Sequence, residues 1–512
     1  MPVWHAIEGC ELTENTFLSV PDQIRAAALR DPDRVALRDE HAALDYRQLV
    51  DAMAATARWL ADAGVGRGDV VAICAFNSAH YVVAYMAAVA MGAVVAPLPQ
   101  SASAESLARM VADCDARLVL VDADTRALFA TGAIRAPVHD LGAITAAHPH
   151  DEALFMWPRL DPDARFNIIY SSGTTGTPKG IVQSQAMRDT HVRLGEACGY
   201  RAGCVTLLST PLYSNTTLIS LLPTLALGGT AVLMRKFDVD GFLALAQAQR
   251  ATHAMLVPVQ YQRLLASAHF DEADLSAFEQ KFCTSAPFSA ELKRDIVARW
   301  PGGLTEYYGM TEGGGLCMLP AHRHPDKLHT VGCPAPDTDM RVLDEQGIEL
   351  PAGGVGEIVG RSAIVMSGYH NRPEDTAAAM WTSPEGLRFV RTGDIGRFDE
   401  DGFLILMDRK KDVIISGGFN IYPSDLEDII REHPGVADAA VVGVPSARWG
   451  ETPVAFVVGT DLAPAKLLES VNARVGKSQR LADLRVVDSL PRNAIGKLLK
   501  RELRAAYAAG AG

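Results

Sequence analysis

The sequence predicts an α/β protein with a large N-terminal domain and a small α+β domain at its C-terminus. Three observations lead to this prediction. Helical and strand-like segments alternate between residues 45 and 170, short runs separated by Gly, Asp and Pro fill residues 337–406, and the pattern changes again after the segment DRKKD at 408–412. Alternation favours layered α/β structure with parallel strands, whereas short runs broken by turn residues favour a β-rich section.

The first elements follow from hydrophobic periodicity. Residues 45–64 carry apolar side chains at helical spacing and end at Gly64, a residue suited to terminate a helix. The run DVVAICA at 69–75 is nearly all apolar, as expected of a buried strand. By the same criteria we expect helices at 79–91 and 104–114 and strands at 93–97, 117–121 and 167–170.

The last hundred residues have their own pattern. We expect helices at 424–432, 464–475 and 497–506, and strands at 437–444, 454–458 and 484–487. This section is large enough to form a separate α+β domain.

Composition excludes several classes of protein. The net charge of −13 does not fit a nucleic-acid-binding protein, which needs clustered Lys and Arg. No apolar run is long enough to span a bilayer, and the N-terminus has no basic, apolar leader, so we expect no membrane span and a cytoplasmic protein. The eight cysteines form no CxxC pair and fit buried, reduced thiols.

The most informative segment is YSSGTTGTPKG at 170–180, which follows the apolar run NIIY. Its glycines let backbone N–H groups approach phosphate oxygens, its hydroxyls donate hydrogen bonds, and Lys179 adds a positive charge. It is not a Walker A loop, because Lys179 follows Pro178 and precedes Gly180. A solvated linker is the alternative, but a linker need not follow a buried strand.

This loop closely resembles the signature of the adenylate-forming (AMP-binding) superfamily, which includes acyl-CoA synthetases, peptide-synthetase adenylation domains and luciferases. Further segments resemble family motifs in the same order: GVGRGDVVAICAFNSAHYVVAYMAAVAMGAVVAPL, YYGMTEGGG, RTGDIGRFDEDGFLILMDRKKDVIISGGFNIYP and PRNAIGKLLKREL. Five motifs in order make the resemblance to this superfamily very specific, and within it we expect the acyl-CoA synthetase type, which includes fatty-acid and aryl-CoA ligases.

The resemblance implies a fold and a reaction. It implies a large domain at 1–410, with two layered α/β subdomains and a β-rich subdomain, and a small mobile α+β domain at 411–512 with its hinge near Lys411. The enzyme would activate a carboxylic acid with ATP and Mg²⁺ as an acyl-adenylate, releasing pyrophosphate, and then pass the acyl group to coenzyme A.

The resemblance also assigns nucleotide-binding residues. Tyr308 would lie against the adenine, Thr311 would contact the α-phosphate, Glu312 would bind Mg²⁺ together with Thr175, and Asp394 and Arg409 would hold the ribose. Lys497 would be catalytic with Thr311 and Glu312, bridging carboxylate and α-phosphate oxygens. The full implied ATP/AMP set is Ser171, Ser172, Gly173, Thr174, Thr175, Gly176, Thr177, Lys179, Ser285, Ala286, Pro287, Tyr307, Tyr308, Gly309, Thr311, Asp394, Arg409 and Lys497.

The resemblance also assigns residues to a thiol-binding site and to a site for the carboxylic acid. Gly417, Gly418 and Phe419 match the family's pantetheine tunnel, and the acyl pocket is expected near Tyr213, Ser214, Val257, Gly313 and Gly314. Ser214 stands where many relatives carry His, and the triglycine 313–315 would leave room for the acid. No Asp or Glu lies between Ser209 and Thr230, which argues against an amino-acid substrate because a buried ammonium needs a counter-charge.

The acid is therefore expected to be hydrophobic, of fatty, alicyclic or arylpropenoate type, with a dicarboxylate such as malonate as a less favoured choice. A stand-alone ligase that loads a carrier-protein pantetheine in trans is the alternative function. A luciferase-like oxidation and a nucleotide sensor without turnover are further alternatives. The sequence leaves open whether the protein is a homodimer.

Overall fold

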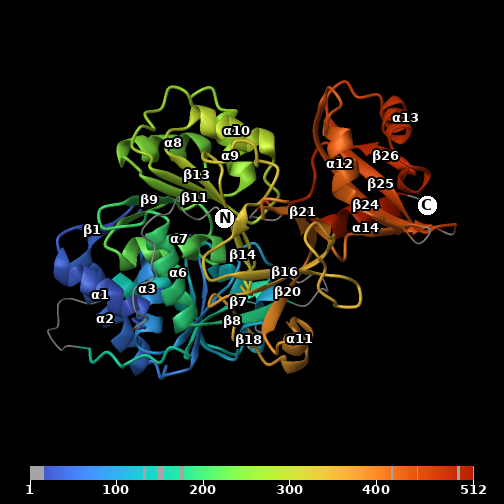
Figure 1. The fold of residues 1–512 in the computed structure, drawn as a ribbon. Helices are drawn as coiled ribbons and strands as arrows, with labels where there is room; N and C mark the ends of the chain where they lie inside the picture. The colour runs from blue at the N-terminus through green and yellow to red at the C-terminus, as the bar shows by residue number, and fades with distance from the viewer. Residues whose placement is uncertain are drawn as a thin grey trace.

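The computed structural model describes residues 17–130, 134–146, 155–171, 178–416, 419–446, 448–492 and 496–510. Figure 1 shows a large N-terminal domain, coloured from blue through green and yellow to light orange, and a smaller C-terminal domain, coloured from deeper orange to red, that follow each other along the chain near strand β21. The large domain contains several sheets and the small domain has one of its own, which confirms the predicted fold class.

The first sheet of the large domain, the β3 sheet, has the strand order β18-β8-β7-β4-β3-β5-β6. Its strands are β3 (Val70–Cys74), β4 (Val94–Pro97), β5 (Ala116–Val121), β6 (Val138–Asp140), β7 (Arg165–Ser171), β8 (Lys179–Ser184) and β18 (Gly368–Tyr369). Pairing is parallel from β7 through β4, β3 and β5 to β6, and antiparallel between β7 and β8. The β7–β8 pair flanks the phosphate-loop sequence.

The second sheet, the β12 sheet, has the order β15-β14-β13-β12-β11-β9-β10-β1-β2. Its strands are β1 (Val35–Arg38), β2 (Ala43–Asp45), β9 (Val205–Leu208), β10 (Thr230–Leu233), β11 (His253–Leu256), β12 (Gln280–Cys283), β13 (Gly303–Gly309), β14 (Leu316–Pro320) and β15 (Cys333–Pro334). Strand β13 ends in the YYG segment, so this sheet positions one side of the predicted nucleotide site.

Helices separate and cover these two sheets. They are α1 (Val20–Arg30), α2 (Tyr46–Asp62), α3 (Ala79–Ala90), α4 (Ala104–Asp113), α5 (Leu141–Ala146), α6 (Gln185–Ala197), α7 (Asn215–Ala226), α8 (Val239–Ala248), α9 (Pro258–Leu265) and α10 (Ala290–Arg299). One apolar core joins α1, α2, α3 and α7 to strands of both sheets, a second packs α4 on the far face of the β3 sheet, and a third packs α8, α9 and α10 on the β12 sheet. The result is a stack of alternating helical and sheet layers.

A third sheet, the β20 sheet, forms the β-rich section predicted for residues 337–406. Its order is β16-β17-β20-β19, with β21 also paired to β20. The bounds are β16 (Asp339–Leu343), β17 (Gly356–Arg361), β19 (Met380–Thr382), β20 (Arg388–Phe398) and β21 (Leu404–Arg409), with helix α11 (Pro373–Ala378) between β18 and β19. The antiparallel β20–β21 pair brings two motif segments side by side.

The small domain has the sheet order β23-β22-β25-β24, with β26 beside β25. Its elements are β22 (Ile414–Ser416), β23 (Phe419–Ile421), α12 (Pro423–Arg431), β24 (Val436–Ser446), β25 (Gly450–Gly459), α13 (Pro464–Arg474), β26 (Asp483–Val486) and α14 (Lys500–Ala509). Its own apolar core gathers Ile414, Leu426, Ile430 and Val457.

The predicted start of the last helix is wrong. Helix α14 begins at Lys500 and not at Lys497. Gly496 has a φ of +77°, in the left-handed region that a right-handed helix cannot use, so the helix cannot extend back through this glycine. Between this glycine and the helix, Leu498 pairs with Arg492 in an isolated antiparallel bridge and Leu499 has a non-helical backbone (φ −98°, ψ 69°), so Lys497 lies in the loop before the helix.

Candidate active site

The predicted ribose pair comes together on the β20 sheet. Asp394 and Arg409 are direct partners on the antiparallel strands β20 and β21, and Arg409 Nε lies 3.4 Å from Asp394 Oδ1. The hydroxyl of Tyr308, at the end of β13, donates to Asp394 Oδ2 at 2.8 Å. Burial raises the pKa of Asp394, and the neighbouring Arg409 opposes this shift. A largely buried carboxylate beside a cation is suited to accept hydrogen bonds from hydroxyl groups.

The two tyrosines of the YYG segment face opposite sides of their strand, as alternation along a strand requires. Tyr308 faces Asp394, whereas the Tyr307 ring stacks on Phe282 with centroids 5.4 Å apart and an interplanar angle of 15°. Tyr307 therefore packs in the β12 sheet, and Gly309 after it ends the strand.

A second polar group connects the phosphate-loop lysine to the predicted metal ligand. Lys179 begins β8, and its Nζ lies 2.6 Å from Asp375 Oδ1 on α11. The same ammonium lies 5.1 Å from the centre of the Tyr369 ring, and the Tyr369 hydroxyl donates to Glu312 Oε1 at 2.9 Å. Tyr369 thus links Lys179 to Glu312, although the three residues come from distant parts of the chain.

Thr311 and Ser285 are held by contacts among neighbouring segments. The carbonyl of Thr311 accepts from Gln183 Nε2 at 2.7 Å, which ties the TEG turn to β8. Ser285 has a φ of +82°, a strained conformation for a residue with a side chain, and its Oγ lies 2.6 Å from Thr216 Oγ1. This hydrogen bond joins the predicted adenine segment Ser285, Ala286 and Pro287 to the start of α7.

The acyl-pocket candidates have structural reasons for their residue types. Ser214 is the N-cap of α7, and its Oγ accepts from the amide of Thr216, so a small hydroxyl residue is favoured there. Tyr213 beside it is largely buried, and burial raises the pKa of its phenol. Val257 is buried just before α9.

The glycines 313 and 314 are required by close packing. A Cβ on Gly313 would lie 2.2 Å from the carbonyl oxygen of Ile364, and one on Gly314 would lie 2.6 Å from Val390. Both have a positive φ. The absence of side chains at these two positions lets the segments around Ile364 and Val390 pack closely, and the role of the glycines in the acyl pocket stays a prediction.

The loop that carries Lys497 rests on the large domain. A Cβ on Gly496 would lie 3.0 Å from Val259 Cγ1, so the loop contacts the start of α9. Burial, reinforced by the cations Arg409 and Lys411, lowers the pKa of Lys497 to about 8, and the negative charge of Asp394 acts in the opposite direction. The Lys497 ammonium thus belongs to the same electrostatic group as the Asp394–Arg409 pair.

Some candidate residues lie outside the described part of the chain: Ser172, Gly173, Thr174, Thr175, Gly176, Thr177, Gly417 and Gly418. Ser171 is the last residue of β7. The described residues contain no helix long and apolar enough to cross a membrane.

Comparison with known proteins decides the family. The model of the AMP-binding enzyme family matches residues 24–370, and that of the AMP-binding enzyme C-terminal domain matches residues 425–497. The chain belongs to the AMP-binding enzyme family. The first match covers more than half of the chain, and the two matches follow the order of the large and small domains.

Relatives within this family are ligases. A feruloyl-CoA synthase from Amycolatopsis sp is 34% identical over 93% of this chain and 96% of the relative. An indoleacetate–CoA ligase from Aromatoleum aromaticum is 30% identical over 93% and 95%, and a fatty acid–acyl-carrier-protein ligase from Streptomyces coeruleorubidus is 30% identical over 93% and 94%. The chain is thus an enzyme of the acyl-CoA synthetase type within the AMP-binding family.

Solved structures of the family agree with the fold. ATP-bound MatB from Rhodopseudomonas palustris superposes with a TM-score of 0.86 at 30% identity, covering 96% of this chain and 99% of that one. The o-succinylbenzoate CoA synthetase of Bacillus subtilis with its acyl-adenylate gives a TM-score of 0.83 at 26% identity, covering 96% and 99%.

Several contacts of this AMP-binding enzyme were not foreseen from its sequence. Asp375, Tyr369 and Gln183 were in none of the predicted site lists, yet each contacts a predicted site residue. No spacing signal connects them, because their partners are far away in the chain. Only Tyr369 carried a weak hint, as an aromatic residue after a glycine in a turn-rich segment.

Proposed function

We propose that this enzyme is an ATP-dependent acid–thiol ligase that makes an acyl-adenylate and transfers the acyl group to coenzyme A. The observation that carries the proposal is the location of Lys497. This lysine comes from the small domain, yet it lies near enough to Asp394 and Arg409 for their charges to act on its pKa, while Gly496 of its loop packs against Val259 of the large domain. Such an arrangement suits a reaction in which two anions must approach each other.

In the first step, a carboxylate oxygen of the acid attacks the α-phosphorus of ATP. The bond from that phosphorus to the bridging oxygen breaks, and pyrophosphate leaves. We assign Lys497 to the charge that accumulates on the carboxylate and α-phosphate oxygens, and Thr311 to a hydrogen bond at the α-phosphate. Asp394 and Arg409 would hold the ribose, and Lys179 with the preceding loop would hold the leaving pyrophosphate.

A magnesium ion fits the proposed site. Mg²⁺ is commonly held by one or two carboxylates together with substrate phosphates and waters, and it would offset phosphate charge here. Glu312 is a partly exposed carboxylate whose orientation is set by the Tyr369 hydroxyl. We propose Glu312 as its carboxylate ligand, with Thr175 as the predicted second ligand.

The acid we propose is hydrophobic, of fatty, alicyclic or arylpropenoate type. The segment from Ser209 to Thr230 contains no Asp or Glu, so nothing in it would pair with an amino group. Relatives named for ferulate, indoleacetate and fatty acids support both aryl and aliphatic choices. Tyr213 and Val257 are proposed to line its pocket.

The second step would use a different arrangement of the two domains, with coenzyme A as the acceptor. We propose the boundary between 410 and 411 and the hinge at Lys411, which lies between the end of β21 at Arg409 and the start of β22 at Ile414. The small domain exposes Ile415, Phe419 and Trp449, with exposed fractions of 57, 65 and 42%. Exposed apolar side chains of this kind would suit a surface that closes around a pantetheine arm.

A carrier-protein pantetheine is the second candidate acceptor, and one observation favours it: a relative of equal coverage is a fatty acid–acyl-carrier-protein ligase. Free coenzyme A and a pantetheine arm present the same thiol, so the same tunnel would admit both.

The test is a panel of acids: ferulate, indole-3-acetate, 2-succinylbenzoate, octanoate and malonate. Each is incubated with ATP and Mg²⁺, and pyrophosphate release and thioester mass are measured with coenzyme A or with a phosphopantetheinylated carrier protein. We expect release with at least one hydrophobic acid and a coenzyme A thioester as its product. ATP binding without pyrophosphate release from any acid would contradict the proposed function and favour a nucleotide sensor.

A further inference from the structure

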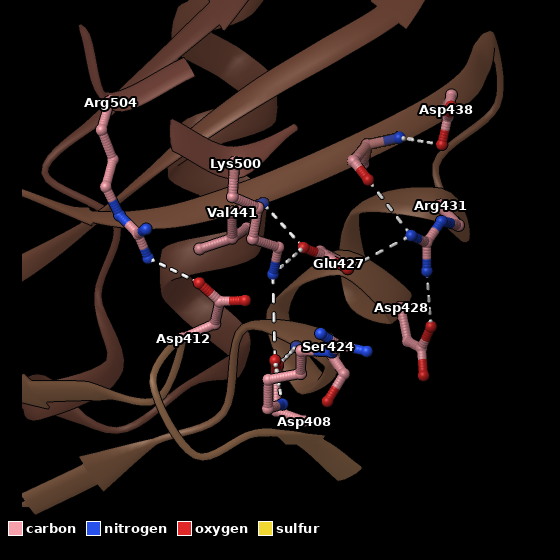
Figure 2. Close-up of polar contacts among 12 residues, drawn as sticks. Asp408, Asp412, Ser424, Glu427, Asp428, Arg431, Asp438, Val441, Lys500 and Arg504 are labelled. Carbon is pink, nitrogen blue, oxygen red and sulfur yellow. Dashed lines mark hydrogen bonds and ion pairs between the residues drawn. The ribbon is translucent and has the colours of Figure 1, made fainter. Parts of the chain in front are cut away.

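A buried polar network lies where strand β21 meets the small domain (Figure 2). Asp408 is the second-last residue of β21, and its Oδ2 accepts from the amide of Ser424 at 3.0 Å. Lys500, the first residue of α14, places its Nζ 3.9 Å from Asp408 Oδ1 and 3.1 Å from Glu427 Oε1. Strand β21, helix α12 and helix α14 therefore meet at the Asp408 carboxylate and the Lys500 ammonium.

Asp408 also supplies a missing helix cap. Helix α12 begins at Pro423, and its N-cap residue Tyr422 makes no side-chain capping hydrogen bond. The carboxylate of Asp408 bonds the amide of Ser424 instead and places a negative charge at the N-terminal end of the helix, which is electrostatically favourable. The first turn of a small-domain helix is thus capped by a residue of strand β21.

The network is buried, so its charges depend on one another. The side chains of Asp408, Lys500 and Glu427 are only 8, 14 and 11% exposed. Burial raises the pKa of Asp408, while the positive charge of Lys500 lowers it. Removing one charge leaves its partner desolvated and uncompensated, which is costly.

The contacts of Asp408 connect residues that lie on opposite sides of the proposed hinge. Asp408 precedes the proposed hinge at Lys411, whereas Ser424 and Lys500 follow it. Rotation of the small domain about Lys411 would carry Ser424 and Lys500 away from Asp408, so both contacts would be lost. By contrast, Arg504 Nη2 lies 2.9 Å from Asp412 Oδ1, and both of these residues follow the hinge.

The same contacts fix the catalytic lysine. Lys500 lies three residues after Lys497, and Asp408 directly precedes Arg409 of the ribose pair. The Lys500–Asp408 contact therefore ties the base of the Lys497 loop to the strand that carries Arg409.

We propose that Asp408 and Lys500 are a positioning pair that holds the small domain in the arrangement in which Lys497 reaches the nucleotide. Because the pair exists only in that arrangement, it favours acyl-adenylate formation over thioester formation. This inference rests on the proposed function and on the hinge at Lys411.

The test compares Asp408→Asn and Lys500→Met with the matched control Arg504→Gln. The control removes a charge pair from the same helix without removing a contact across the hinge. Two half-reactions are measured: single-turnover pyrophosphate release with the panel acid that reacts fastest, and thioester formation from its chemically prepared acyl-adenylate. We expect Asp408→Asn and Lys500→Met to slow the first about tenfold and to leave the second unchanged or faster. Arg504→Gln should leave the ratio of the two rates unchanged.

A second measurement does not depend on activity. Hydrogen–deuterium exchange of the Ser424 amide reports the contact with Asp408 directly. We expect faster exchange at Ser424 in Lys500→Met, which releases the carboxylate from its cation, and wild-type exchange in Arg504→Gln. If Asp408→Asn fails to fold, Lys500→Met alone is measured, both for its two half-reaction rates and for its Ser424 amide exchange.

The outcomes separate the two proposals. A wild-type protein that releases no pyrophosphate with any acid contradicts the proposed function, and the Ser424 exchange then tests the pair alone. Equal slowing of both half-reactions in Asp408→Asn and Lys500→Met would overturn the positioning role, as would unchanged Ser424 exchange in Lys500→Met.

Discussion

The low pKa of Lys497 makes the first half-reaction sensitive to pH. Burial and the nearby cations lower this pKa to about 8, well below the ordinary value for lysine. The proposed role needs the ammonium form, because only a cation offsets charge on the carboxylate and α-phosphate oxygens. For a group whose charged form is the protonated one, a lowered pKa means that the active form is lost as pH rises through about 8.

The size of the effect follows from that value. With a pKa of about 8, roughly nine tenths of Lys497 is protonated at pH 7 and roughly one tenth at pH 9. The kcat/KM for ATP reports groups of the free enzyme, so it should fall about tenfold between pH 7 and pH 9. Lys497→Arg keeps its charge over the whole range, and its profile should show no such fall, whatever its absolute rate.

The assay is the initial rate of pyrophosphate release at low ATP and saturating acid, measured every half pH unit from 6.5 to 9.5. Circular dichroism over the same range controls for unfolding. A flat wild-type profile would refute the reasoning, and so would a fall of the same size in Lys497→Arg.

Three further predictions concern other described contacts. Asp375→Asn removes the carboxylate that holds Lys179 and that competes with the ATP phosphates for it. We therefore expect the KM for ATP in steady-state kinetics to fall about two- to fivefold. A raised KM would contradict this. Gly496→Ala places a residue with a side chain in the left-handed backbone region and pushes its Cβ against Val259. Pyrophosphate release should slow about five- to tenfold, while thioester formation from supplied acyl-adenylate changes little. Equal slowing of both half-reactions would contradict this prediction. Lys281 is fully buried, and its ammonium donates to three backbone carbonyl groups just after α10. Lys281→Met should therefore lower the unfolding free energy by about 2–4 kcal/mol, measured by urea denaturation. A loss below about 1 kcal/mol would contradict this prediction.

Much of the large domain was predictable from local signals. The expected helix at 79–91 is α3 (Ala79–Ala90), and the expected strand at 69–75 is β3 (Val70–Cys74). Both signals are strong because the strand is apolar throughout and the helix is flanked by Ser78 and Gly92, which favour helix ends. Elements whose hydrophobic pattern is continuous are therefore recovered within one or two residues.

The site was predicted in part. The family resemblance pairs Asp394 with Arg409, and the antiparallel strands β20 and β21 bring these two distant positions into register. The contact of Lys179 with Asp375 joins residues that are 196 positions apart, and no periodicity or spacing reports such a contact. The triglycine at 313–315 was interpreted as room for the acid, but a sequence cannot tell which neighbour requires a missing Cβ.

The boundary before α14 shows a different limit. Residues 497–506 are amphipathic and basic, so the periodicity extends the helix to Lys497. The bridge between Arg492 and Leu498 and the non-helical backbone of Leu499 instead place the start of the helix at Lys500. Tertiary contacts decide such ends, and local propensity does not.

We propose that a cation from the small domain serves a nucleotide held by the large domain during adenylation alone. The most direct measurement is the rate of each half-reaction in Lys497→Ala, with an acid that the wild type activates. We predict that acyl-adenylate formation falls by a factor of at least about a hundred, whereas thioester formation from supplied acyl-adenylate stays within about threefold of the wild type. An equal loss in both half-reactions, or no loss in the first, would contradict this role of Lys497.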